Sequence, residues 1–116
     1  MFEIDYYDLP NGEMPVEKFI NSLDNKMRAK VFGRIELLKE YGNSLREPYS
    51  KYVREGLFEL RIEFAGDITR IFYFFITGSM IILTNGFIKK NDKTPKKEID
   101  LAKKYKDEYE KRSRNE

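Results

Sequence analysis

Charged side chains at alternating positions of apolar segments are the residues of this sequence that could carry out chemistry. They lie in LFELRIEF, in ITRIFYFFIT and at the end of MIILTNGFIKK, and they are Glu59, Arg61, Glu63, Arg70, Lys89 and Lys90. Arginine and lysine bind polyanions such as phosphates, and a carboxylate or a lysine with a lowered pKa can act as a general base. These residue types suit acid–base chemistry on an anionic substrate, provided that the fold brings them together.

The composition excludes several other chemistries. The chain has 116 residues, of which 41% are hydrophobic, so we expect one domain over residues 1–116 with a buried core. It contains no cysteine and no histidine. Disulfides, thiolate nucleophiles, the usual zinc ligand and the usual neutral-pH base are therefore excluded. No metal or other cofactor is implied, and any catalysis must use Asp, Glu, Lys, Arg, Tyr or hydroxyl groups.

The charge is distributed unevenly, although the net charge is only +2. Residues 1–14 carry four acids and no base, whereas residues 89–116 carry eleven bases and seven acids. A basic C-terminal segment can indicate a polyanionic partner, but a charged helix face is more often simply solvated. No apolar stretch approaches the roughly 18 residues of a membrane span, so we expect no membrane partner and a cytoplasmic location.

The N-terminal third predicts a strand and two helices. The strand, FEIDYYDL, stops at Pro10-Asn11-Gly12, Pro15 suits a first helical turn, and Asp24 or Asn25 caps the second helix, which ends at Gly42. Apolar residues at helical spacing mark the inner faces, namely Val16, Phe19, Ile20 and Leu23, then Met27, Val31, Ile35 and Leu38. Such a helical hairpin needs a sheet or another helix to cover its apolar side.

The remaining sequence predicts a three-strand antiparallel meander and a last helix. Residues 43–56 are interpreted as an ordered loop that can include a short strand. The strands cover residues 57–64, 68–77 and 80–90, with two-residue turns at Gly66-Asp67 and Gly78-Ser79. Thr94 and Pro95 then suit the N-cap and first turn of a helix. Its inner side is formed by Ile99, Ala102, Tyr105 and Tyr109.

These turns fix which side chains share a face of the meander. They place Glu63 opposite Arg70, Leu60 opposite Tyr73, Leu83 opposite Phe74 and Ile81 opposite Ile76, whereas a three-residue first turn would put Arg70 on the apolar face. One face then carries Glu59, Arg61, Glu63, Arg70, Phe72, Asn85, Phe87 and Lys89. Because folds of this class often cover only one face of the sheet, this face is expected to be an open concavity.

Purely structural roles for these residues are the alternative to this interpretation. A pairing of Glu63 with Arg70 is also typical of an ordinary exposed sheet face, where it contributes about 0.2 to 1 kcal/mol. The rings of Phe72 and Phe87 could equally be core aromatics under the last helix, which is the favoured role for Phe74. The tyrosines of the middle loop, Tyr49 and Tyr52, are interpreted as packing residues.

Three segments together resemble the RelE/ParE superfamily of toxins from bacterial type II toxin–antitoxin modules, and within it the HigB-like, phage-derived branch. They are YVREGLFELRIEF, GDITRIFYFF and ILTNGFIKKNDKTPKKEIDLAKKYKDEY. The resemblance covers essentially the whole chain. It implies a RelE-like α+β fold, with an N-terminal strand and helical hairpin followed by a three-strand antiparallel meander and a C-terminal helix.

The same resemblance implies a function. It predicts a ribosome-dependent endoribonuclease that needs no metal, cuts mRNA, inhibits translation and is neutralised by a cognate antitoxin protein. Its partners would be that antitoxin, the ribosome and mRNA. The predicted catalytic residues are Arg61, Arg70, Lys89, Lys90, Glu59 and Glu63, and the predicted substrate-binding residues are Phe87, Asn85, Phe72, Lys93 and Lys97. The chain differs from several relatives in having no histidine, so a histidine base is impossible.

The identity of the general base stays open at this point. Glu59, Glu63 or a Lys89 whose pKa is lowered by neighbouring arginines could remove the proton of the 2′-hydroxyl, with Lys90 assisting the leaving group. Two other functions also stay open. A ParE-like toxin would bind DNA gyrase without cutting RNA, and a non-catalytic basic module would only bind a partner.

Overall fold

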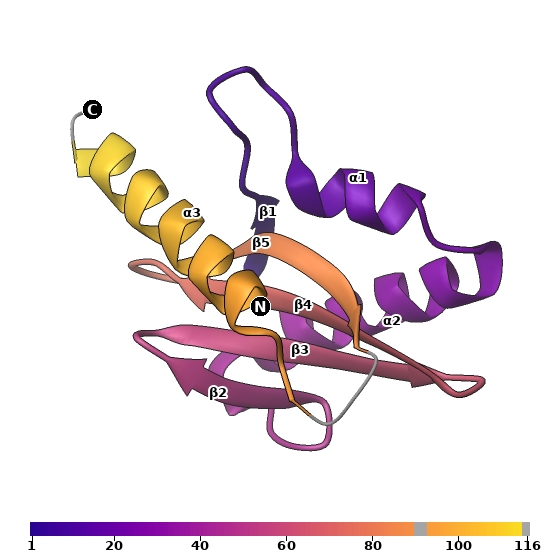
Figure 1. The fold of residues 1–116 in the computed structure, drawn as a ribbon. Coiled ribbons are helices and arrows are strands. Elements are labelled where there is room, and N and C mark those ends of the chain that lie inside the picture. Colours follow the sequence, from indigo (N-terminus) through magenta and orange to yellow (C-terminus); the bar gives the residue numbers. More distant parts are fainter. Residues whose placement is uncertain (90–92, 115–116) are drawn as a thin grey trace.

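The fold is a five-stranded sheet with helices on both faces (Figure 1), in a computed structural model that describes residues 1–89 and 93–114. Along the chain its elements are β1 (Glu3–Tyr6), α1 (Pro15–Asn21), α2 (Asn25–Tyr41), the 3₁₀ turn η1 (Gly42–Ser44), β2 (Ser50–Arg54), β3 (Leu57–Phe64), β4 (Asp67–Phe75), β5 (Met80–Lys89) and α3 (Lys96–Arg114). The α+β class is therefore confirmed. No helix of the described residues is both long enough and apolar enough to cross a membrane.

The sheet is larger than the predicted meander. Its strand order is β1-β5-β4-β3-β2, in which β1 runs parallel to β5 and all other neighbours are antiparallel. The meander is thus present as β3, β4 and β5, and two further strands flank it. The helices α1 and α2 carry the chain from β1 at one edge of the sheet to β2 at the other, and the antiparallel strands that follow return it to β5 beside β1. The edge strand β2 lies in the segment interpreted as an ordered loop that can include a short strand.

The helical hairpin follows the sequence signals closely. Pro15 opens α1, and the Asp24 carboxylate caps α2 by accepting a hydrogen bond from the Met27 N–H at 2.9 Å. The predicted inner face of α2 is buried, and it packs with Val16 and Ile20 of α1 on one face of the sheet. This packing forms the first hydrophobic core, to which the sheet contributes residues such as Leu60 and Tyr73.

The predicted open concavity is wrong, because α3 covers much of the opposite face (Figure 1). A second core forms there from Phe72, Phe74, Phe87 and neighbouring residues packed against Ala102 of α3. Phe72 and Phe74 are fully buried, and Phe87 is 7% exposed. The rings of Phe72 and Phe87 stack on each other with centroids 5.6 Å apart. Both are therefore core aromatics under the last helix, which was the alternative to their predicted role in substrate binding.

The register between β3 and β4 differs from the prediction by two residues. The turn is Ala65-Gly66, both with positive φ (54° and 84°), rather than Gly66-Asp67. Arg61 therefore lies opposite Arg70, and Glu63 lies opposite Ile68. Because side chains alternate with a period of two, a shift of two residues changes the partners but keeps every side chain on its predicted face.

The register between β4 and β5 is correct at one end and wrong at the other. Phe87 lies opposite Arg70, as predicted. A bulge between Ile71 and Tyr73 then shifts the pairing by one residue, so that Leu83 lies opposite Tyr73 instead of Phe74. At the turn, the Ile76 N–H donates to the Met80 carbonyl at 3.1 Å, which leaves a three-residue loop where a two-residue turn was predicted.

Candidate active site

A polar pocket of about 260 Å³ lies at the β2 side of the sheet, on the face that α3 covers only in part. It is lined by residues of β2, β3, the end of β5 and the segment before α3, namely Lys51, Tyr52, Val53, Glu59, Arg61, Lys89 and Thr94. We call it the Glu59 pocket. Lys51 lies directly opposite Glu59 in the pairing of β2 with β3, so both side chains point to the same face.

The Glu59 carboxylate is the centre of the charged groups. It is 3% exposed, and its Oε1 lies 2.7 Å from Nε of Arg70 and 3.6 Å from Nε of Arg61. The Thr94 hydroxyl donates to Oε2 at 2.8 Å. A buried carboxylate is stable as an anion only when cations and hydrogen bonds compensate its lost hydration. Glu59 has both.

Arg70 lies behind Glu59 and does not itself line the pocket. It is only 2% exposed, and burial lowers the pKa of its guanidinium, an effect that Glu59 partly opposes. The Arg70 Nε–H is not aligned for a hydrogen bond with Glu59 despite the 2.7 Å separation, so the contact is an ion pair rather than a well-formed hydrogen bond. From this position Arg70 can hold Glu59, whereas a solvent-borne phosphate does not reach it.

Arg61 is the arginine that the pocket presents to solvent. Its side chain is 21% exposed and lies between Glu59 and Glu47, whose Oε1 accepts from Arg61 Nη1 at 3.3 Å. The Arg61 backbone N–H donates to the Tyr49 carbonyl at 2.8 Å, which fixes the strand beneath the side chain. An incoming anion can replace the exposed Glu47 carboxylate on this guanidinium at little expense, since exposed ion pairs are weak.

Lys89 faces the same pocket from the last residue of β5. Burial is the main cause that lowers the pKa of its ammonium group, and Arg70, Arg61 and Lys51 lower it further, while Glu59 acts in the opposite direction. The sequence had suggested the neighbouring arginines as the cause, but burial comes first. A lysine with a lowered pKa has a larger neutral fraction and can accept a proton.

The model of a protein family described as Phage derived protein Gp49-like (DUF891) matches residues 18–107 of the chain, which include every lining residue of the Glu59 pocket. The chain belongs to this family. The Gp49-like proteins are a RelE-like toxin family, so the resemblance holds at that level, while the HigB branch stays a prediction. A comparison with curated proteins found no match.

Several predicted site residues of this Gp49-like protein lie away from the pocket. Glu63 is exposed, opposite Ile68, and Asn85 is buried with its amide nitrogen donating to the Glu98 carbonyl at 3.3 Å. Asn85 thereby fastens the first turn of α3 to β5. Lys93 and Lys97 are exposed but are not among the lining residues. The prediction for Lys90 lies outside the described residues.

Three members of the pocket, Lys51, Val53 and Thr94, were not predicted as site residues, and the role of a fourth was predicted only in part. Lys51 comes from β2, which lies in the segment interpreted as an ordered loop that can include a short strand. Thr94 was predicted to cap the last helix, but α3 begins at Lys96 and the Thr94 hydroxyl binds Glu59 instead. Tyr52 was interpreted as a packing residue, and its ring does pack edge-to-face on Phe58, but it is also 55% exposed and lines the pocket. Recognising SKYVR as a strand that pairs with β3 would have placed Lys51 beside Glu59.

Proposed function

We propose that this Gp49-like protein is the toxin of a type II toxin–antitoxin module and that it cuts mRNA on the ribosome. The observation that carries the proposal is the Glu59 pocket, in which the cations Arg61, Lys51 and Lys89 surround one buried carboxylate. A phosphodiester needs positive groups on one side and a proton acceptor close by. The pocket provides these groups without histidine or cysteine.

The reaction is an in-line attack of a ribose 2′-hydroxyl on the adjacent phosphorus. The O2′–P bond forms as the P–O5′ bond breaks, the O2′ proton passes to a base and the O5′ oxygen takes up a proton. Arg61 is suited to hold the phosphate oxygens, because its fork of donors strengthens its grip as negative charge develops. Alignment by the ribosome would supply a further large part of the rate, about 7 to 11 kcal/mol in good cases.

Lys89 is the base that the geometry favours. Both oxygens of Glu59 are already engaged, one by Arg70 and the other by Thr94. The lowered pKa of Lys89 increases the neutral fraction that can receive the O2′ proton. Lys51, on the other side of Glu59, supplies a second cation and a donor for the leaving O5′. In this arrangement Glu59 and Arg70 orient the reacting side chains.

The test compares variants in a translating extract, with cut sites mapped by primer extension on a defined mRNA. Wild type should cut, and Arg61→Ala should lower the cleavage rate by about 10²-fold, the usual loss for one positioned donor. Lys89→Met should lower it as well. Arg114→Ala, in the last turn of α3, is the matched arginine control and should cut like wild type. All variants should unfold cooperatively at similar denaturant concentrations.

Two outcomes would contradict the proposal. Intact mRNA with folded wild-type protein, together with a change in DNA supercoiling, would favour the ParE-like function on gyrase. Equal cleavage by wild type and Arg61→Ala would remove the Glu59 pocket as the catalytic centre, even if RNA is cut.

A further inference from the structure

A second pocket adjoins the Glu59 pocket across the edge strand β2. It measures about 560 Å³, and Leu45, Arg46, Tyr52 and Phe58 are among its lining residues. Lys51 and Tyr52 line both pockets but belong to opposite faces of the sheet, so the two openings lie on either side of this edge strand. We call it the Tyr52 pocket. Its lining combines aromatic rings with cations, which differs from the mainly charged lining of its neighbour.

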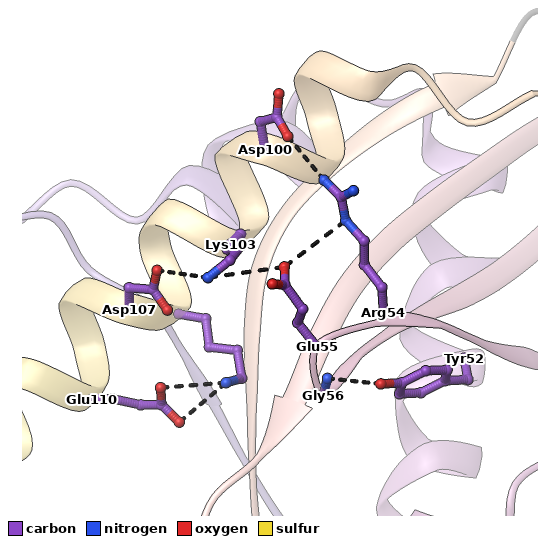
Figure 2. Close-up of polar contacts among 9 residues, drawn as sticks. Tyr52, Arg54, Glu55, Gly56, Asp100, Lys103, Asp107 and Glu110 are labelled. Atoms are coloured by element: carbon purple, nitrogen blue, oxygen red, sulfur yellow. Dashed lines mark hydrogen bonds and ion pairs between the residues drawn. The ribbon is translucent and has the colours of Figure 1, made fainter.

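Tyr52 is fixed at the junction of the two pockets. Its hydroxyl accepts a hydrogen bond from the Gly56 N–H at 3.1 Å, a contact that Figure 2 shows at the β2–β3 turn. Its ring packs edge-to-face on Phe58, with centroids 5.2 Å apart, yet the residue remains 55% exposed. A large ring that is held in orientation and exposed to solvent can stack with little loss of conformational entropy.

The turn that holds Tyr52 is itself fastened to α3. Arg54 Nη2 lies 3.0 Å from Asp100 Oδ1, and Glu55 Oε2 lies 3.9 Å from Nζ of Lys103 (Figure 2). Gly56 has a φ of 81°, which favours glycine, so its N–H is presented to the tyrosine by a backbone that few other residues adopt. The ring position therefore depends on contacts from two separate elements.

The charge around the Tyr52 pocket suits an anionic chain. Arg46 and Lys51 are exposed at its rim. The one acid among its lining residues, Glu47, is paired with Arg61 at 3.3 Å. Aromatic stacking surfaces interleaved with cations are typical of proteins that bind single-stranded nucleic acid, whose splayed bases stack while the phosphates follow the positive groups.

We propose that the Tyr52 pocket binds the base next to the scissile phosphate, with the base stacked on the Tyr52 ring. This inference rests on the proposed RNA cleavage and extends it to substrate positioning and base preference. The phosphate lies in the Glu59 pocket. The RNA strand crosses the edge strand β2 between Lys51 and Tyr52, so that one nucleotide occupies both openings. Tyr52 touches the substrate but takes no part in proton transfer.

The first experiment measures single-turnover cleavage on ribosomes programmed with a defined mRNA. Tyr52→Ala should slow cleavage roughly 10- to 100-fold, the usual range for losing one stacked base, and should change the preference among sites. Tyr52→Phe keeps the ring and should retain most of the rate. Tyr41→Ala removes a comparably exposed tyrosine from the end of α2, outside both pockets, and should behave as wild type.

An abasic nucleotide beside the cut site then tests the contact itself. If the base stacks on Tyr52, the abasic mRNA should slow wild type strongly but should slow Tyr52→Ala little further, because both changes remove the same interaction. Additive effects of the two changes would overturn the inference. So would a Tyr52→Ala protein that cuts the same sites at the wild-type rate.

A titration of the isolated protein separates this inference from the proposed function. The probe is a trinucleotide with a 2′-deoxyribose at the cleavage position, followed by amide NMR signals. Shifts at Leu45, Tyr52 and Phe58 that disappear with an abasic trinucleotide would support base binding, even if wild type failed to cut mRNA. Shifts confined to Lys51 and Arg61, or shifts reproduced by inorganic phosphate alone, would overturn it, even if wild type cut mRNA.

Discussion

Replacing Arg70 by methionine should destabilise the fold strongly, because it leaves Glu59 buried without its closest cation. Removing one partner of a buried ion pair usually costs about 3 to 5 kcal/mol. Arg61, at 3.6 Å, and the Thr94 hydroxyl, at 2.8 Å, would still compensate part of the Glu59 charge. We therefore expect a loss of about 3 kcal/mol in the free energy of unfolding, at the lower end of that range.

Urea unfolding of four proteins measures this effect. They are wild type, Arg70→Met, Glu59→Gln and the double variant. Because glutamine is neutral and can still accept from Thr94, the double variant should be more stable than the sum of the single losses predicts, by about 2 kcal/mol. Arg54→Met is the matched control. Its ion pair with Asp100, at 3.0 Å, is exposed, so its loss should stay within about 1 kcal/mol.

The reasoning fails if Arg70→Met loses less than about 1 kcal/mol, as the arginine of an exposed pair would. It also fails if the two single losses simply add, since the two side chains would then act independently. A domain of this size is commonly stable by about 5 to 15 kcal/mol, so Arg70→Met should remain mostly folded and measurable. Activity lost in this variant would be uninformative about phosphate binding unless the protein is shown to be folded.

Three further predictions concern glycine packing and two titrating side chains. Gly86→Ala should cost about 1 to 3 kcal/mol in urea unfolding, because its Cβ would lie 2.4 Å from the Phe19 ring, whereas Gly33→Ala, with nothing within 4 Å of the new Cβ, should be neutral or stabilising. Burial raises the pKa of Tyr73 from 10.0 to about 12, so the folded chain holds more protons than the unfolded chain between these pH values. Wild type should therefore lose stability relative to Tyr73→Phe as the pH rises from 10 to 12. A difference in the free energy of unfolding that stays constant over this range would contradict the prediction. Burial lowers the pKa of Lys89 below 10.5, so the unfolded chain holds more protons than the folded chain at pH values just below 10.5. Lys89→Met should therefore be more stable than wild type at pH 7. This difference in stability should shrink as the pH approaches 10.5.

The faces of the sheet were predictable from the sequence, but the pairing within them was not. Alternation of apolar and charged residues excludes slips of one residue, because these would bury Arg70 among the apolar side chains of the other face. It does not exclude a slip of two, which keeps every side chain on its face. The real turn places Ala65 at a φ of 54°, a conformation unusual for alanine, while the expected turn began with glycine. Local propensity therefore selected the wrong one of two registers that the pattern allows.

The burial of Arg70 could not be read from the strands alone. Arg70 lies on the sheet face whose aromatic part α3 covers, next to Glu59, and α3 lies far along the sequence. The same is true of Lys51 and Thr94, which reach Glu59 only because β2 pairs with β3 and the chain passes the pocket before α3 begins. By contrast, the inner faces of α1 and α2 needed only local periodicity, and the sequence predicted them residue by residue.

The pocket lies where α3 no longer covers the sheet. Within α3, packing against the sheet involves Ile99, Ala102, Tyr105 and Tyr109, whereas Thr94 precedes the helix and donates a hydrogen bond to Glu59 of the sheet. The polar end of the sheet therefore stays open while its aromatic part is buried. Lys89 ends β5 at this boundary, where burial is partial: enough to lower its pKa, but not enough to remove it from the pocket. A fully covered lysine could not meet a substrate, and a fully exposed one would lack the burial that lowers its pKa.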